Sequence, residues 1–342
     1  MVTAVVVAAV IVVLGVDALS QVGRASAPVR RTENRSFADL ALPVVDQSNA
    51  TGASLDSLWS KGPSFERVTF FSDLATVASD SAVEDRAFLA LTPPDPSGEV
   101  LRRCQATMSG RRVAAAHLEG DLERLLGGRD GFGGGDEAAA VGGLVTIGAE
   151  LRAADTSWES CRRALRHQPG SARLASSTWV QDPGAWGEAA VSQQVASLVS
   201  SPTLAAVHRL ALVSVSTTPA AIPAVDGVGV VPPSTRLAVR VVVADDGNVD
   251  EPRVDLVVAA VPQGSSGGPP PVRVTTGLEP GQSVVLSPPP LKVAPGRSYV
   301  LTIAATPASG PGRAATSVPL RVSAPPPTTT TTTTTTVPAR RR

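Results

Sequence analysis

Aromatic residues are scarce in this chain of 342 residues, which has six phenylalanines, four tryptophans and one tyrosine. A surface that stacks nucleic acid bases or sugars needs aromatic side chains, so this composition argues against one. An excess of charge of one sign is also missing, because 30 basic residues balance 30 acidic ones. Without a basic excess, the overall charge gives no reason to expect nucleic acid as a partner.

Catalytic and cofactor-binding motifs are missing as well. The three histidines, His117, His167 and His208, are scattered, and none lies near a nucleophile in the sequence. The glycine-rich stretch 131–135 follows a predicted helix rather than a strand and lacks the Lys-Ser/Thr element of a phosphate loop. We therefore expect no catalytic residue, no cofactor and no enzymatic activity.

Cysteine is limited to Cys104 and Cys161, and both lie on apolar seams that flank the glycine-rich stretch 127–135. The seams repeat with spacings of three and four, which is typical of two packed helices. Arg111 fills the one skipped position of the first seam. The first seam consists of Leu101, Cys104, Met108, Ala115, Leu118, Leu122 and Leu125, and the second of Leu144, Ile147, Leu151, Ala154, Trp158, Cys161 and Leu165.

A chain reversal at the glycines would pair these seams antiparallel, in a hairpin over 97–167, and would place Cys104 opposite Cys161. We therefore predict a disulfide between them; the alternative is two buried free thiols. A metal site is not expected, because no histidine shares the seam. A disulfide forms in an oxidising compartment, so it favours an extracytoplasmic location.

A run of apolar residues begins the chain and extends to about Val22, which is close to the thickness of a bilayer. We expect residues 1–23 to be a retained transmembrane signal anchor. A cleaved signal peptide is the alternative, but proline follows the small-residue pattern at 25–27. The arginines that follow the run favour a cytoplasmic body. The cysteine pair outweighs this, so we predict a single-pass cell membrane protein whose bulk is extracytoplasmic.

A helical domain is predicted over 36–200. Residues 64–91 have a helical apolar pattern, and the prolines at 93–96 end it before the hairpin. Asp182-Pro183 is typical of a helix start, and Pro202 limits the helix that follows. These segments together predict a bundle.

Alternating apolar residues replace the helical pattern beyond His208. Short strands separated by Pro/Gly turns predict a β-sandwich over 205–323. Tyr299 follows a Pro-Gly turn and opens a strand, as in a tyrosine corner, so its hydroxyl should bond to the upstream backbone.

Three segments within 205–323 carry a family resemblance: 241–249, 278–283 with its Glu-Pro-Gly-Gln sequence, and Pro295-Gly296 followed by Tyr299. Together they are similar to bacterial surface domains of the CARDB type. These domains are immunoglobulin-like or fibronectin-III-like sandwiches named for cell adhesion. The resemblance implies a fold and a cell-surface setting, and it assigns no binding residue.

Acidic and amide side chains gather at Asp245, Asp246, Asn248 and Asp250. Calcium binds several oxygens in a loop, so this group is a weak calcium candidate. The spacing does not match an EF-hand, and a hairpin turn uses the same residue types, so we favour a turn.

The C-terminal segment 324–342 consists largely of proline and threonine and is expected to be disordered. The predicted fold class is therefore α+β multidomain, with a transmembrane helix, a disulfide-stapled bundle, an immunoglobulin-like sandwich and a disordered tail. The predicted function is a non-enzymatic envelope protein with a structural, adhesive or scaffold role. A sensory or accessory ectodomain that binds a small ligand or a partner membrane protein is the alternative. Expected partners are the membrane, envelope or wall components or other proteins, and no nucleic acid.

Overall fold

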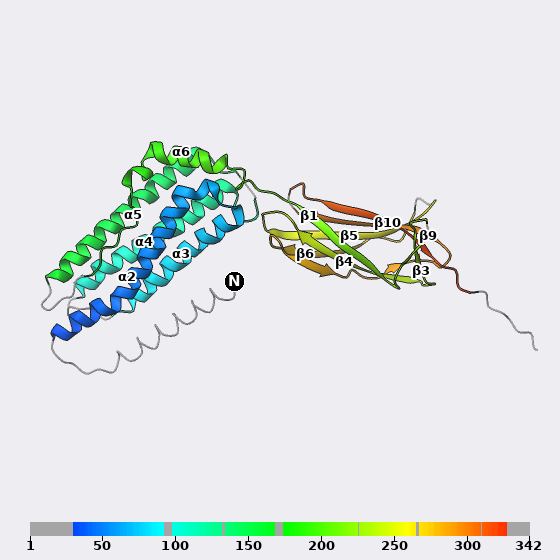
Figure 1. Ribbon diagram of the computed structural model, residues 1–342, viewed down its shortest axis with the longest axis horizontal. Coiled ribbons are helices and arrows are strands. Elements are labelled where there is room, and N and C mark those ends of the chain that lie inside the picture. Colours follow the sequence, from blue (N-terminus) through cyan, green and yellow to red (C-terminus); the bar gives the residue numbers. More distant parts are fainter. Residues whose placement is uncertain are drawn as a thin grey trace, which may run out of the picture. The chain divides into compact units, whose positions relative to one another are not determined.

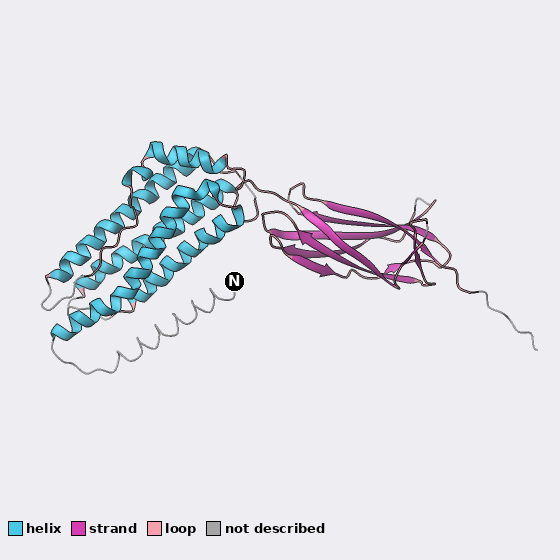
Figure 2. Cartoon of the chain, viewed as in Figure 1, coloured by secondary structure: helices cyan, strands magenta, loops and turns pink. Residues whose placement is uncertain are grey.

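The computed structural model describes residues 30–91, 98–131, 134–167, 174–224, 226–264, 267–308 and 310–326, with side chains from Phe37 onward. Helices form the N-terminal half of this part and strands form the C-terminal half (Figures 1 and 2). The chain divides into two compact units. Among the described residues, the first combines 30–62 with those of 73–121 and 141–194, and the second combines 63–72 with those of 122–140 and 195–326.

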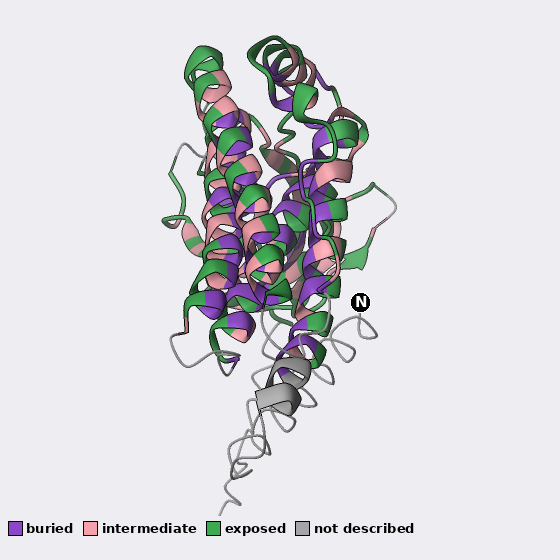
Figure 3. Ribbon diagram, turned by 90° about the vertical axis from the view of Figure 1, so that its left-hand side faces the viewer, coloured by how far each residue is buried: buried purple, intermediate pink, exposed green. Residues whose placement is uncertain are grey.

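Four long helices and one shorter helix occur in the described residues, and their buried residues gather on the inner faces (Figure 3). The helices are α2 (Arg30–Lys61), α3 (Arg67–Leu89), α4 (Glu99–Leu126), α5 (Glu137–Arg166) and α6 (Glu188–Val199), with 3-10 turns η1 (Gly62–Ser64) and η2 (Pro183–Trp186). The segment expected at 64–91 corresponds to α3. The helix expected at Asp182 is divided, because Asp182 caps η2 and α6 begins at Glu188.

Helix α2 was not assigned as a single helix from the sequence. It contains Pro43, and its buried stripe combines apolar residues such as Phe37 and Val45 with polar Ser48 and Thr51. Polar residues on the inner face interrupt the apolar helical period of α2, so its sequence does not indicate one long helix.

The disulfide of the first unit joins Cys104 of α4 to Cys161 of α5, with their Cα atoms 4.9 Å apart. Both residues are fully buried in an apolar cluster that also holds Phe88, Met108 and Trp158. Helix α4 ends where the sequence indicates, because Gly127 adopts a left-handed φ of 79° that other residues rarely take.

Two sheets share one apolar core in the second unit. The first has the order β1-β4-β7, with β8 also paired to β4, and the second has the order β2-β3-β10-β9-β5-β6. The strands are β1 (Leu210–Thr218), β2 (Ile222–Pro223), β3 (Gly229–Val231), β4 (Arg236–Asp245), β5 (Glu251–Pro262), β6 (Val272–Leu278), β7 (Ser283–Leu286), β8 (Leu291–Lys292), β9 (Ser298–Pro307) and β10 (Ala314–Val322).

One expectation about the strands is confirmed, and another is wrong. The expected hydroxyl bond is confirmed, because the backbone N–H of Ala294 donates to the Tyr299 hydroxyl oxygen at 2.7 Å. The hairpin turn expected after Asp245 is wrong. Strands β4 and β5 belong to different sheets, so residues 246–250 form an arch between the sheets rather than a hairpin.

The predicted fold class also requires correction. The C-terminal region contains a mixed sheet, because β3 runs parallel to β10, whereas β10 with β9 and β2 with β3 pair antiparallel. Residues 1–23, the predicted transmembrane anchor, lie outside the described residues. Within the described ranges, no helix is both long and apolar enough to cross a bilayer. The predicted membrane span, signal segment and single-pass cell membrane location are therefore not supported. The predicted tail from residue 327 onward also lies outside the described residues.

Candidate functional site

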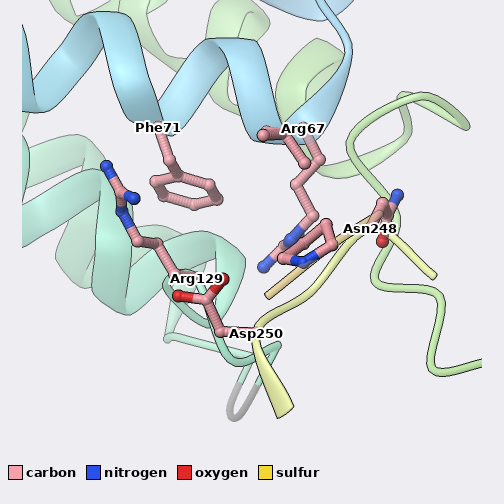
Figure 4. Close-up of a pocket in the computed structure, with 7 residues that line it drawn as sticks. Arg67, Phe71, Arg129, Asn248 and Asp250 are labelled. Carbon is pink, nitrogen blue, oxygen red and sulfur yellow. The ribbon is translucent and has the colours of Figure 1, made fainter. Parts of the chain in front are cut away.

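A shallow cleft with a volume of about 20 Å³ opens within the second unit (Figure 4). It is smaller than the pockets that hold drug-sized ligands. Its lining combines charged, amide and apolar residues that all belong to this unit. The lining residues are Arg67, Val68, Phe71, Arg129, Asn248, Asp250 and Pro280.

Arg67, the first residue of α3, is only 1% exposed and binds main-chain oxygens. Its guanidinium donates to the carbonyls of Leu204 at 2.5 Å, of Leu126 at 2.8 Å and of Gly128. The last two carbonyls end helix α4, where a cation is electrostatically favourable. Burial lowers the pKa of Arg67, and nearby Asp130 opposes this shift. Arg67 therefore fastens the end of α4 and the connection after α6.

One nitrogen of the Arg67 guanidinium takes no part in these hydrogen bonds. Its Nε is buried and has no hydrogen-bond partner among the described residues. The guanidinium also lies over the Phe71 ring, 4.9 Å from the centroid. A cation over an aromatic face is attracted to it, so Phe71 helps to hold Arg67 at the cleft.

The opposite side of the cleft is formed by the arch between β4 and β5. The backbone N–H of Asp250 donates to the Arg129 carbonyl at 2.8 Å. Burial raises the pKa of the Asp250 carboxyl, with further contributions from Glu279 and Asp130, while Arg129 lowers it. The arch is thus joined to the loop after α4 through main-chain atoms.

The predicted calcium candidates have other tasks in the structure. The Asn248 side-chain oxygen accepts a hydrogen bond from the Val207 N–H at 2.7 Å, and its amide nitrogen donates to the Ala205 carbonyl at 2.9 Å. Asp245 is buried and accepts from the Gly247 N–H at 2.8 Å, and burial raises its pKa. Asp246 is exposed. Across the described ranges, no group of three or more histidine, cysteine, aspartate or glutamate residues could hold a metal ion.

The three histidines lie in different segments of the chain. His208 is half-buried in the second unit, with its Nδ1 2.8 Å from the Glu251 carboxylate, whereas His117 is exposed and lies 3.1 Å from Glu150. His167 follows the end of α5. These are ion-pair and helix-end positions, and none places a histidine against a nucleophile in the contacts described.

A second charged site lies inside the first unit, around Arg111 of α4. Arg111 is 1% exposed and donates to the Asp155 carboxylate at 2.8 Å, to the Ser48 hydroxyl at 3.0 Å and to the Ser177 hydroxyl at 2.7 Å. It also donates to the Ser177 carbonyl at 3.1 Å. Burial lowers the pKa of Arg111, and the bond to Asp155 counteracts this.

Glu84 of α3 belongs to the same site and is 2% exposed. The Thr51 hydroxyl donates to its carboxylate at 2.5 Å. Burial raises the pKa of Glu84 to about 7, although its hydrogen bonds with Thr51 and Ser48 act in the opposite direction. Glu84 is therefore an acid whose charge changes near neutral pH.

The site around Arg111 holds residues 174–186, which we call the strap, a segment without α-helix or strand that ends in the turn η2. The Asp155 carboxylate accepts the N–H groups of Trp179 and Val180 at 3.0 Å. Other bundle side chains donate to strap carbonyls: Trp158 to Ala175 at 3.1 Å, Arg162 to Leu174 at 3.1 Å, Asn49 to Ser176 at 3.2 Å and Trp59 to Ala185 at 3.3 Å. The bundle thus binds the strap mainly through its backbone.

Two tryptophans anchor the strap. Trp179 lies over Arg111, with 5.2 Å between the guanidinium carbon and the ring centroid, and Trp186 stacks on Trp59 at 4.5 Å. Both are buried. Both rings therefore pack against the bundle and form no exposed aromatic site.

One residue of the Arg111 site is indicated by its position in the sequence. Arg111 occupies a seam position that an apolar residue would normally fill, and a charge there requires a buried partner. Its partners Ser48, Asp155 and Ser177 come from three distant segments and have no local pattern of their own. Arg67 gave no signal, because a single arginine at the start of a helix is common.

Comparisons with known proteins do not assign the chain to a family. No family model and no curated protein matches it. The structure of Pseudomonas fluorescens alkylpurine DNA glycosylase AlkC, bound to DNA with an abasic site analogue, is 14% identical over 86% of this chain and 100% of that one. The TM-score is 0.21. A likeness this weak carries no argument about fold or activity.

The predicted partners are corrected accordingly. A membrane reached through an N-terminal helix is not supported, because no spanning helix occurs in the ranges that the structure describes. The expected absence of nucleic acid as a partner stays a prediction, because a neighbour with a TM-score of 0.21 carries no argument in either direction. The low TM-score gives no reason to assign DNA binding to this chain.

Proposed function

We propose that this chain is a non-enzymatic protein with a structural, adhesive or scaffold role. One observation carries the proposal: the two buried arginines, Arg67 and Arg111, donate their hydrogen bonds to carbonyls and other fixed groups of the fold. Charges used in this way rigidify a fold and leave little for catalysis.

The disulfide and the sequence resemblance support the same role. A buried cross-link stabilises a protein that must last in an oxidising environment. The resemblance of residues 205–323 to CARDB-type domains adds an adhesive setting. An adhesive protein works through its outer surface, so it requires stable units more than a deep pocket.

Binding of envelope fragments by the intact chain tests this proposal. Beads coated with the full oxidised chain should retain fragments of the producing cells several-fold better than beads coated with the heat-unfolded chain. Equal retention on both kinds of bead would contradict an adhesive or scaffold role. Turnover of a small substrate by the purified chain would contradict the non-enzymatic assignment.

A sensory or accessory role is the second candidate, and the cleft of the second unit favours it. The exposed Arg129 at the cleft would suit a small carboxylate. Acetate titrated into the full chain should then raise the melting temperature, and Arg129→Ala should abolish the rise. An unchanged melting temperature removes this candidate.

A further inference from the structure

The strap is held by groups that also surround Glu84. The Ser48 hydroxyl lies 3.2 Å from the Trp179 indole nitrogen and is also hydrogen-bonded to Glu84. Arg111 bonds to Ser177 of the strap, lies under Trp179, and attracts the Glu84 charge. A change in the charge of Glu84 therefore acts on the same side chains that fix residues 176–180.

The charged and polar groups around Glu84 come from α2, α3, α4 and α5. Helix α2 contributes only the neutral donors Thr51 and Ser48, and α3 contributes Asp80, which repels the Glu84 charge. Helix α4 contributes Arg111, which attracts it, and the next charge is Asp155 of α5, paired with Arg111. With both carboxylates ionised, one guanidinium faces two negative charges in a buried site.

Neutral Glu84 leaves a balanced pair of Arg111 and Asp155 beneath the strap. Ionised Glu84 adds an unbalanced buried charge, which is costly unless water or a rearrangement compensates it. The strap forms part of the cover over Ser48 and Arg111, so its opening would admit that water. The closed strap thus favours the neutral acid, and the open strap favours the ionised acid.

We propose that the strap is a pH-controlled latch, in which protonated Glu84 keeps residues 176–180 closed on the bundle and ionised Glu84 loosens them. This inference goes beyond the proposed function and does not depend on it. The latch would change the exposure of Trp179 and of the side chains Ser48, Arg111 and Asp155 that bind the strap.

The pH window follows from the two states of Glu84. With the strap closed its pKa is about 7, and in a water-filled open site it returns toward the usual 4.5. Closure is then complete at acidic pH, weakens as pH rises from about 5 to 7, and stays constant above 7, where both states are ionised.

Hydrogen exchange of the full chain between pH 5 and 8, corrected for intrinsic exchange rates, tests the latch. The amides of Trp179 and Val180 should lose protection by up to about tenfold per pH unit until pH 7 and then level off. Their exchange should be insensitive to low urea, because only the strap opens. Amides of 144–151 in α5 should instead follow the urea dependence of global unfolding.

Three variants make the test specific. Glu84→Gln should remove the pH dependence of strap protection. Thr51→Val should move the loss to higher pH, since it removes a bond that favours the ionised acid, and it serves the test if the first variant does not fold. Asp46→Asn, which removes an exposed charge of α2, should retain the original profile. A flat profile in the unmodified chain, an unchanged profile in Glu84→Gln, or strap exchange with the urea dependence of α5 would overturn the latch.

Discussion

At the scale of single residues, the buried arginines link parts of the chain that are distant in sequence. Arg67→Met should lower the free energy of unfolding by about 2–4 kcal/mol, because it removes the donors that cap α4 and bind the Leu204 carbonyl. Urea unfolding measures the change. Arg129→Met is the control, since Arg129 is exposed and should change stability by less than about 0.5 kcal/mol. Similar losses in both variants would contradict the role given to Arg67.

Glu84 gives the stability of the chain a pH dependence of defined sign. Its pKa is raised to about 7 in the folded state, so the unfolded chain loses the proton first as pH rises. Stability should therefore fall between about pH 4.5 and 7, by up to roughly 3 kcal/mol, and then stay constant.

Glu84→Gln should flatten this decline and should be more stable than the unmodified chain at pH 8. Urea unfolding at pH 5 and pH 8 measures both effects. Stability that rises from pH 5 to 8 in the unmodified chain and does not respond to this substitution would show that Glu84 is not the titrating group.

At the scale of elements, the disulfide fixes α4 against α5. It closes a loop of 57 residues, for which the chain-entropy estimate is about 4 kcal/mol. Replacing both cysteines by alanine should lower the free energy of unfolding by up to that amount, as measured by urea unfolding. Equal stability of the oxidised chain and the double variant would mean that packing alone holds the hairpin.

Glycines position the strap against the helices. A Cβ atom at Gly52 of α2 would lie 2.6 Å from the Trp179 ring, so Gly52→Ala should displace the strap and lower the melting temperature. Gly142→Ala in α5 is the matched control, because no atom lies within 4 Å of its Cβ position. Alanine favours a helix over glycine by about 1 kcal/mol, so the control should raise the melting temperature. A stabilised Gly52→Ala would contradict the contact.

Local patterns predicted some of these elements and missed others. The seams around Cys104 and Cys161 are apolar and regular, so the two helices could be read directly from their spacing. Helix α2 and the strap could not, because Ser48, Thr51 and Ser177 are polar residues whose burial depends on Arg111 and Glu84. A polar inner face has no apolar period, and its partners are identified only after the chain has folded.

At the scale of the whole molecule, sequence patterns and spatial contacts divide the chain differently. The change from helical to alternating patterns put a boundary between residues 200 and 205. The structure assigns 63–72 and 122–140 to the same unit as the strands. The apolar period of the sequence could not indicate this division, because both segments consist of helix ends and a loop. They belong with the strands because of contacts such as the hydrogen bond from the Asp250 N–H to the Arg129 carbonyl.

A fragment of residues 205–326 should therefore be incomplete even if its sheets form. It would lack Arg129 and Gly131. Gly131 packs closely against this region, because a Cβ atom added to it would lie 2.9 Å from the Ala206 methyl and 3.0 Å from a Val249 methyl. Amides of 206–208 and 248–250 should exchange faster in the fragment than in the full chain, while those in the centres of β5 and β9 should be similarly protected. Hydrogen exchange of both proteins measures this. Identical protection of the arch in the two would mean that the strands form a self-sufficient domain and that the loop after α4 adds nothing to it.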